Sequence, residues 1–342
     1  MSDSFAHLSQ PVVGSIIEAA SNPFIGLFIG LLVTALIQSS STSTTLIVAA
    51  VASGSIDFHN AVPMIMGANI GTTITSTIVA LGFIGKKNVF NKAISAAVVH
   101  DYFNILVVLL LFPLELKYGL LSEAAENISR ALIGNTSITG TNQFRLQLLD
   151  LSPFTEVFTS LSKITFVNLL ISFILLFSAI KILAREVSQL LIGGSEDKLQ
   201  RYIFTNTGMS FLWGTLITGL IQSSSISTSL VVPFVATGKI SLKRIAPFIM
   251  GANVGTTITA FIAVFFRSYE LVSIAMVHLI FNMVGVIIFL PFPFTRHLIV
   301  RLAEKFGELA ANFRIAVLIY ILMIFFVIPF CLIYFTQALS EA

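Results

Sequence analysis

The sequence predicts an all-α integral membrane fold built from two inverted repeats, each with a re-entrant helical hairpin and a discontinuous transmembrane helix. The first reason is composition, because 56% of the 342 residues are hydrophobic and only 10% are charged. The mean hydropathy of +0.96 lies far above that of soluble domains. The second reason is an internal duplication, and the third is the polar sequence that each copy carries inside apolar segments.

The duplication is visible in a motif of one glutamine and three serines. Residues 38–41 read Gln-Ser-Ser-Ser, and so do residues 222–225. The same offset relates residues 67–73 to residues 251–257. When the 46 residues from position 30 are aligned with those from position 214, about 28 are identical. The chain therefore contains two copies of one unit.

The first copy spans residues 23–113 and follows an amphipathic lead-in over residues 1–22. Its two opening arms are each too short to cross a bilayer and meet at the serine-rich tip, which is typical of a re-entrant hairpin. The helix over residues 61–81 should break at its Gly-Ala-Asn-Ile-Gly motif, which favours an irregular backbone. A full span over residues 94–112 follows, and Pro113 should end it.

The second copy, residues 203–293, repeats this order. We expect a hairpin over residues 211–236, a broken helix over residues 245–265 and a span over residues 271–290. The remaining segments are a polar extracellular connector (residues 114–160), a linking span at 164–183 with a cytoplasmic segment (161–202), and a cytoplasmic amphipathic helix with a final span (294–342).

The basic residues indicate that the two copies face opposite ways. The loop after the first hairpin carries no Lys or Arg, whereas the loop after the second carries Lys239, Lys243 and Arg244. The segments after the broken helices show the reverse pattern, with Lys86, Lys87 and Lys92 in copy one and only Arg267 in copy two. Under the positive-inside rule, equivalent loops of opposite basic content lie in opposite compartments. This topology places about 14 of the 19 basic residues inside.

The hairpin tips predict an anion site. The returning arms begin near Ser40 and Ser224, so each tip presents a helix N-terminus with free N–H groups and a partial positive charge. Donors that converge from two inverted hairpins suit a tetrahedral oxyanion. Neither motif contains Lys or Arg, so mobile cations bound by oxygen ligands should balance the anion. The alternative, that small polar residues merely pack helices together, is the weaker interpretation because the whole motif is duplicated.

The candidate cation ligands are amide and hydroxyl side chains near the tips and the broken helices. They are Gln38, Thr42, Asn69, Thr72, Thr73, Gln222, Asn253, Thr256 and Thr257. Asp101 joins them, because a carboxylate inside a span is by default a cation or proton site, although it could be a helix-end residue near Lys92. Asp101 lies in a third repeated pattern, H-x-x-F-N, which begins at His100 and His278. These histidines could equally be packing residues.

Several classes of function are disfavoured. No nucleophile–base pair, metal cluster or nucleotide-binding loop stands out, so we expect neither an enzyme nor a cofactor. The one cysteine, Cys331, makes a transition-metal site improbable. The formal net charge of +3 could suggest nucleic acid as a partner. However, the basic residues flank the membrane spans, so orientation in the bilayer explains them better.

The chain resembles the type II sodium-dependent phosphate cotransporter family. The resemblance rests on both Gln-Ser-Ser-Ser motifs, on residues 63–73 and 247–257, on Val-His-Asp-Tyr-Phe-Asn at 99–104 and on Pro-Phe-Thr-Arg at 293–296. It implies inorganic phosphate as substrate, sodium as the driving ion and, because residue 101 is Asp, electrogenic symport. The sequence departs from electrogenic members at Ser95, where they tend to have Ala. Phosphate binding is assigned by resemblance to Ser39, Ser40, Ser41, Ser223, Ser224 and Ser225, with sodium nearby.

We therefore expect sodium-coupled phosphate import by alternating access, one repeat moving against the other. One protomer should suffice, and a bacterial inner (plasma) membrane is the favoured location. The alternatives are a sodium-coupled transporter of another oxyanion, such as arsenate, sulfate or a dicarboxylate, and a passive anion channel or membrane sensor.

Overall fold

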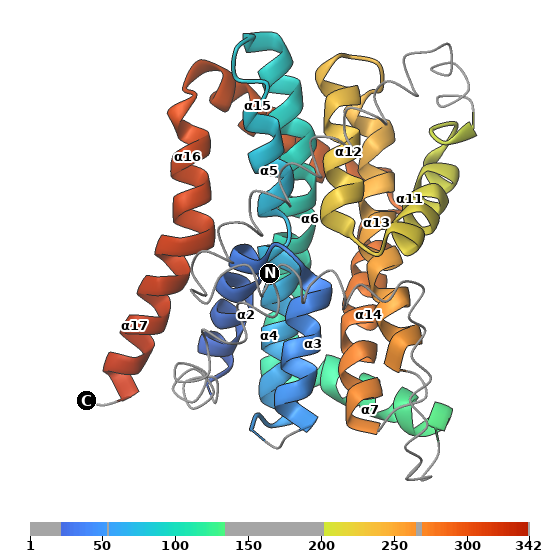
Figure 1. The fold of residues 1–342 in the computed structure, drawn as a ribbon, viewed down its shortest axis with the longest axis vertical. Helices are drawn as coiled ribbons and strands as arrows, with labels where there is room; N and C mark the ends of the chain where they lie inside the picture. The colour runs from blue at the N-terminus through green and yellow to red at the C-terminus, as the bar shows by residue number, and fades with distance from the viewer. Residues whose placement is uncertain (1–21, 53–54, 134–201, 265–268, 341–342) are drawn as a thin grey trace, which may run out of the picture.

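The computed structural model describes residues 22–52, 55–133, 202–264 and 269–340, and every regular element in these ranges is helical (Figure 1). The helices of the first copy and its continuation are α2 (Pro23–Ile37), α3 (Ser40–Ala52), α4 (Phe58–Gly71), α5 (Ile74–Leu81), α6 (Lys87–Tyr118) and α7 (Leu120–Ile133). The second copy and the C-terminal part contain α11 (Thr207–Ile221), α12 (Ser224–Ala236), α13 (Leu242–Val264), α14 (Tyr269–Phe289), α15 (Pro293–Asn312), α16 (Ile315–Leu322), the π-helical turn η1 (Met323–Val327) and α17 (Ile328–Ser340).

The chain is an α-helical membrane protein. Four segments of the described ranges are long and apolar enough to cross a bilayer: Phe58–Leu81, Lys87–Tyr118, Leu271–Phe289 and Ile315–Phe335. The last of these is the least covered by protein, which suits a helix that faces lipid. The predicted lead-in and the predicted span at 164–183 lie outside the described residues, apart from Asn22.

Two helical hairpins open the two copies. Asn22 caps α2 by accepting a hydrogen bond from the Phe24 N–H at 2.9 Å, and Asn206 caps α11 by accepting one from the Met209 N–H at 2.8 Å. None of the four hairpin helices exceeds 15 residues, which corresponds to about 22 Å, less than the roughly 30 Å of a hydrocarbon core. In Figure 1 α2 and α3 extend downward from the middle of the molecule, whereas α11 and α12 extend upward from it.

Glycines allow the same close helix contact in both copies. A Cβ on Gly30 would overlap the backbone of Met64, and one on Gly67 would overlap the backbone of Leu27. The equivalent glycines of copy two, Gly214 and Gly251, meet the backbones of Phe248 and Phe211 in the same way. The α2–α4 and α11–α13 pairs therefore pack backbone against backbone, as small residues permit within membranes.

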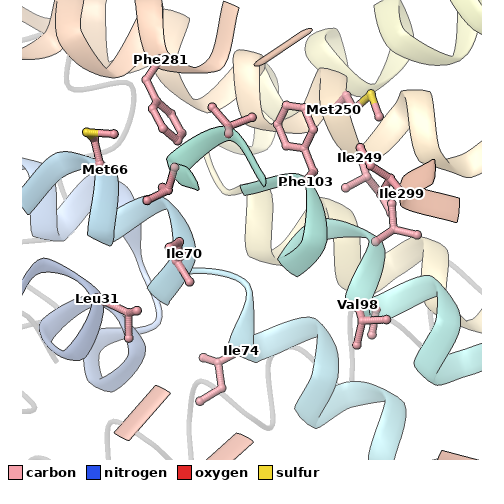
Figure 2. Packing of buried hydrophobic residues seen from close by; sticks show 14 of the residues in the cluster. Leu31, Met66, Ile70, Ile74, Val98, Phe103, Ile249, Met250, Phe281 and Ile299 are labelled. Carbon is pink, nitrogen blue, oxygen red and sulfur yellow. The ribbon is translucent and has the colours of Figure 1, made fainter. Parts of the chain in front are cut away.

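The apolar core joins the two copies. Figure 2 shows buried side chains from both of them, among them Leu31, Met66, Phe103, Met250 and Phe281. The ring of Phe103 on α6 contacts that of Phe289 on α14, with 6.0 Å between centroids and the planes at 73°. Such edge-to-face contacts add to the stabilisation from burial.

The prediction of a broken helix in each copy is right for the first and wrong for the second. In copy one, α4 ends at Gly71 and α5 begins at Ile74. In copy two, α13 continues without interruption from Leu242 to Val264. The Thr256 hydroxyl bonds to the Ala252 carbonyl and the Thr257 hydroxyl to the Val254 carbonyl, so local contacts satisfy the motif within a continuous helix.

The prediction that Pro113 ends its span is also wrong. Helix α6 continues to Tyr118, since Pro113 removes only its own N–H donor. Gly119 ends the helix with a φ of 58°, a conformation that glycine adopts at little cost. The buried Glu115 carboxylate then accepts hydrogen bonds from Leu121 N–H at 2.6 Å and from Ser122, and so holds the start of α7. The described part of the predicted polar connector is thus helical.

Candidate binding site between the two copies

Both hairpin tips turn on a glutamine in a left-handed conformation. Gln38 and Gln222 each have a φ of 59°, and they are the only non-glycine residues with positive φ in the described ranges. Each backbone N–H bonds at 2.6 Å to a threonine carbonyl, that of Thr34 or Thr218. This conformation is uncommon for a residue with a Cβ. The same strain at both tips marks them as candidate functional positions.

The first serine of each tip caps the helix that follows. The Ser39 hydroxyl accepts a hydrogen bond from Thr42 N–H at 3.3 Å, and the Ser223 hydroxyl accepts one from Ile226 N–H at the same distance. Ser39 also donates to the Thr42 hydroxyl at 3.0 Å. Because the first N–H groups of a helix have no acceptor within it, the amides of the next two serines are available at each tip.

The second tip contacts the first. The Ser225 hydroxyl is within hydrogen-bonding distance of two carbonyls of copy one, those of Gln38 at 3.4 Å and Thr72 at 3.3 Å. Farther along the same helix, Ser76 and Thr228 share a hydrogen bond of 2.9 Å between their hydroxyls. Three of the predicted site residues, distant in sequence, therefore meet where α4 gives way to α5.

Two buried asparagines connect the copies crosswise. The Asn69 side-chain oxygen accepts hydrogen bonds from Asn282 at 3.0 Å and lies 3.0 Å from His278 Nε2. In the mirrored arrangement, Asn253 Oδ1 lies 2.6 Å from His100 Nε2, and its amide nitrogen donates to Asn104 at 3.0 Å.

Each asparagine of one copy is thus held by the H-x-x-F-N pattern of the other. The pattern gives the histidines a structural role that the sequence left open. It also means that the side-chain oxygens of Asn69 and Asn253, both predicted sodium ligands, already have partners in this structure.

Asp101 lies fully buried on α6, beside α5 and α16. Its Oδ2 accepts hydrogen bonds from the Tyr320 hydroxyl at 2.8 Å and the Thr77 hydroxyl at 3.3 Å. Its Oδ1 has no hydrogen-bond partner among the described residues. An unpartnered carboxylate oxygen in this environment is costly unless something binds it, and a cation is the natural ligand.

Other predicted ligands differ in how far they are free to bind. The Gln38 side-chain oxygen and the Thr72 hydroxyl are buried without a partner in the described part of the chain. The hydroxyls of Thr73, Thr256 and Thr257 instead bond to carbonyls of their own helices. Gln222 is exposed. Among the described residues, no group of three His, Cys, Asp or Glu side chains is arranged to hold a metal.

Sequence reasoning missed some participants. Ser76, Thr77 and Thr228 follow the predicted site residues Thr73 and Ser225 by three or four positions and could have been found by helical spacing. Tyr320 could not, because it lies in the final apolar span far from any motif. Ser95 packs away from these groups, against Gly307 of α15, and donates to the Asn91 carbonyl at 2.9 Å.

Comparison with known proteins identifies the family of this chain. A model of the Na+/Pi-cotransporter family matches residues 1–139 and 174–315. The chain belongs to this family. No solved structure matches it significantly.

One curated relative of this chain is sodium-dependent phosphate transport protein 2A of Rattus norvegicus. The two are 31% identical over 410 aligned positions, which cover 96% of this chain and 64% of the rat protein. Protein 2B of Homo sapiens is 30% identical, with 90% of this chain and 58% of the human protein covered. The chain thus spans less than two thirds of the length of these relatives.

Proposed function

We propose that this chain is a sodium-coupled symporter that imports inorganic phosphate, and not an enzyme. The observation that carries the proposal is the meeting of two serine-rich helix N-termini, where Ser225 of one copy reaches the Gln38 and Thr72 carbonyls of the other. The names of the relatives, which describe sodium-dependent phosphate transport, support the same substrate and the same ion.

The anion would bind at the two tips. Each tip offers backbone N–H groups at the positive end of a helix, together with serine hydroxyl donors. Since Ser39 and Ser223 already cap their helices, the amides after them are the stronger donors to a phosphate oxygen. The proposed phosphate site comprises Ser39, Ser40, Ser41, Ser223, Ser224 and Ser225.

Sodium would bind at oxygens that lack a protein partner. Gln38 Oε1, Thr72 Oγ1 and Asp101 Oδ1 satisfy this condition in the described part of the chain, and hard cations prefer such oxygens. The carboxylate of Asp101 supports electrogenic transport. Its negative charge can balance one sodium ion beyond those that the phosphate charge balances, so the transported ions can carry a net positive charge. The other predicted sodium ligands remain candidates that would have to exchange existing hydrogen bonds.

Alternating access is the proposed mechanism. Hairpins that extend in opposite directions support an inverted repeat (Figure 1), and helices too short to cross a bilayer support re-entrant segments. The two copies also differ where their sequences agree, because α4 and α5 are separated by a break and α13 is continuous. In an inverted-repeat transporter, the two copies would exchange these conformations when the binding site changes from outward-facing to inward-facing.

One protomer should suffice for transport, because both tips come from one chain. The proposed location is a bacterial inner (plasma) membrane.

Uptake into proteoliposomes tests the function. An inward sodium gradient should accelerate the uptake of radiolabelled phosphate at least about tenfold over an equal potassium gradient, with an inward current, because cations must accompany the anion. Excess sulfate or succinate should not compete, whereas arsenate, which has the same tetrahedral shape and charge, should. Uptake that ignores sodium would favour a passive channel, and strong competition by succinate would favour a dicarboxylate carrier.

Serine substitutions at the tips locate the anion. Ser40→Ala and Ser224→Ala should each raise the phosphate concentration for half-maximal uptake about tenfold, the effect of losing one hydrogen bond to a charged group. Both serines are buried at the tips. Thr45→Ala is the matched control, since its exposed hydroxyl bonds only to the Ser41 carbonyl of its own helix. An unchanged phosphate affinity in both serine variants would place the anion elsewhere.

A further inference from the structure

Asp101, the proposed sodium ligand, is contacted by a residue from outside the duplicated units. Tyr320 lies on α16, beyond residue 315, where the match to the family ends. Its hydroxyl donates to Asp101 Oδ2 at 2.8 Å, although the two residues are 219 positions apart in the sequence. It is shorter than the other hydrogen bond at Oδ2, which the Thr77 hydroxyl donates at 3.3 Å.

The tyrosine ring is fixed from two sides. It packs on Phe306 of α15 with 4.7 Å between ring centroids, and on Phe325 of η1 with 6.3 Å. Phe325 is itself fully buried, although little of the final span is buried. Phe325 lies in a π-helical turn, in which the Ile328 N–H bonds back to the Met323 carbonyl just before Pro329. The ring therefore has little freedom, and its hydroxyl is aimed at the carboxylate.

Orientation of the carboxylate follows from this contact. A carboxylate has two oxygens, and fixing one of them sets the direction of the other. At Asp101 the fixed oxygen is Oδ2, and the oxygen without a partner is Oδ1. Two hydroxyl donors on Oδ2 also leave Oδ1 as the oxygen best able to accept a cation.

We propose that Tyr320 is a positioning residue of the sodium site, which holds Asp101 Oδ2 so that Oδ1 faces the cation. The inference rests on the proposed function. It extends the transport machinery beyond the two copies to the final span, whose lower part, α17, packs against α2 of the first hairpin (Figure 1).

Tyr320→Phe tests the assignment, because it removes only the hydroxyl and keeps the ring between Phe306 and Phe325. At saturating phosphate, the sodium concentration for half-maximal uptake into proteoliposomes should rise about tenfold, while the maximal rate changes less than about twofold. The matched control is Tyr334→Phe in the same span, whose ring is 62% exposed. It should leave the sodium dependence unchanged.

A second measurement covers a variant that transports poorly. Sodium without phosphate should raise the Tm of the detergent-solubilised protein, and in Tyr320→Phe this rise should require about ten times more sodium. An unchanged sodium dependence of the Tm and of uptake, even with a lower maximal rate, would overturn the assignment to Tyr320. A wild-type protein whose uptake ignores sodium would instead overturn the proposed function itself.

Discussion

Gly67→Ala is expected to prevent the first copy from packing. The added Cβ would overlap the carbonyl of Leu27, and its neighbours there are backbone atoms of α2 that no side-chain rotation can move. Helices α2 and α4 would have to separate, and overpacking of this kind costs about 3 kcal/mol. Gly251→Ala should act equally on copy two, where the Cβ would overlap the carbonyl of Phe211.

Thermal unfolding in detergent, read together with size-exclusion profiles, measures this effect. Both variants should lose most of the monodisperse protein or unfold well below the wild type. Gly219→Ala is the matched control, because a Cβ there meets nothing within 4 Å. It should keep or raise stability, since alanine favours a helix by up to about 1 kcal/mol over glycine. A Gly67→Ala protein as stable as the control would contradict the close α2–α4 contact.

Asn69→Ala is expected to destabilise the junction between the copies by about 2 kcal/mol. It removes the acceptor of His278 Nε2 and one of the two acceptors of the Asn282 amide, so a buried imidazole donor loses its partner. The Asn69 amide also donates to the Ile65 carbonyl at 2.8 Å, and this contact within α4 is lost as well. The rate of phosphate uptake should also fall, even at temperatures where the variant stays folded, because the junction lies beside the tips.

The mirrored variant makes this prediction specific. Asn253→Ala should cost a similar amount, because Asn253 Oδ1 is the hydrogen-bond partner of His100 Nε2 and the Asn253 amide nitrogen donates to Asn104 Oδ1. Asn88→Ala, at an exposed position near the start of α6, is the control and should change the free energy of unfolding by less than about 0.5 kcal/mol. If Asn69→Ala unfolded like Asn88→Ala, the crosswise bonds would not stabilise the protein.

Local sequence predicted much of the hairpin architecture. The short apolar arms and the polar tips are properties of neighbouring residues. The duplication also indicated which positions would have the same conformation, and the backbone angles of Gln38 and Gln222 agree to within a degree in φ. Asp101 was singled out because a carboxylate inside an apolar span demands a reason.

Other features were decided by contacts between distant segments. The sequence motifs of α4 and α13 differ only at Ile70 and Val254, yet only the first copy breaks there. In that copy the Thr72 carbonyl accepts a hydrogen bond from the Ser225 hydroxyl of the other tip. The continuation of α6 through Pro113 was likewise not evident from the sequence, since a proline can end a helix or be tolerated in it.

Sequence by itself determined the class of fold, the duplication and the polar groups that had to find partners inside a membrane, because composition and helical spacing are local properties. Only the tertiary structure decided that Asn69 is held by His278, Asn253 by His100 and Asp101 by Tyr320. The physical reason is that a hydrogen bond between segments far apart in the chain depends on how whole helices pack. No periodicity in either segment encodes that arrangement.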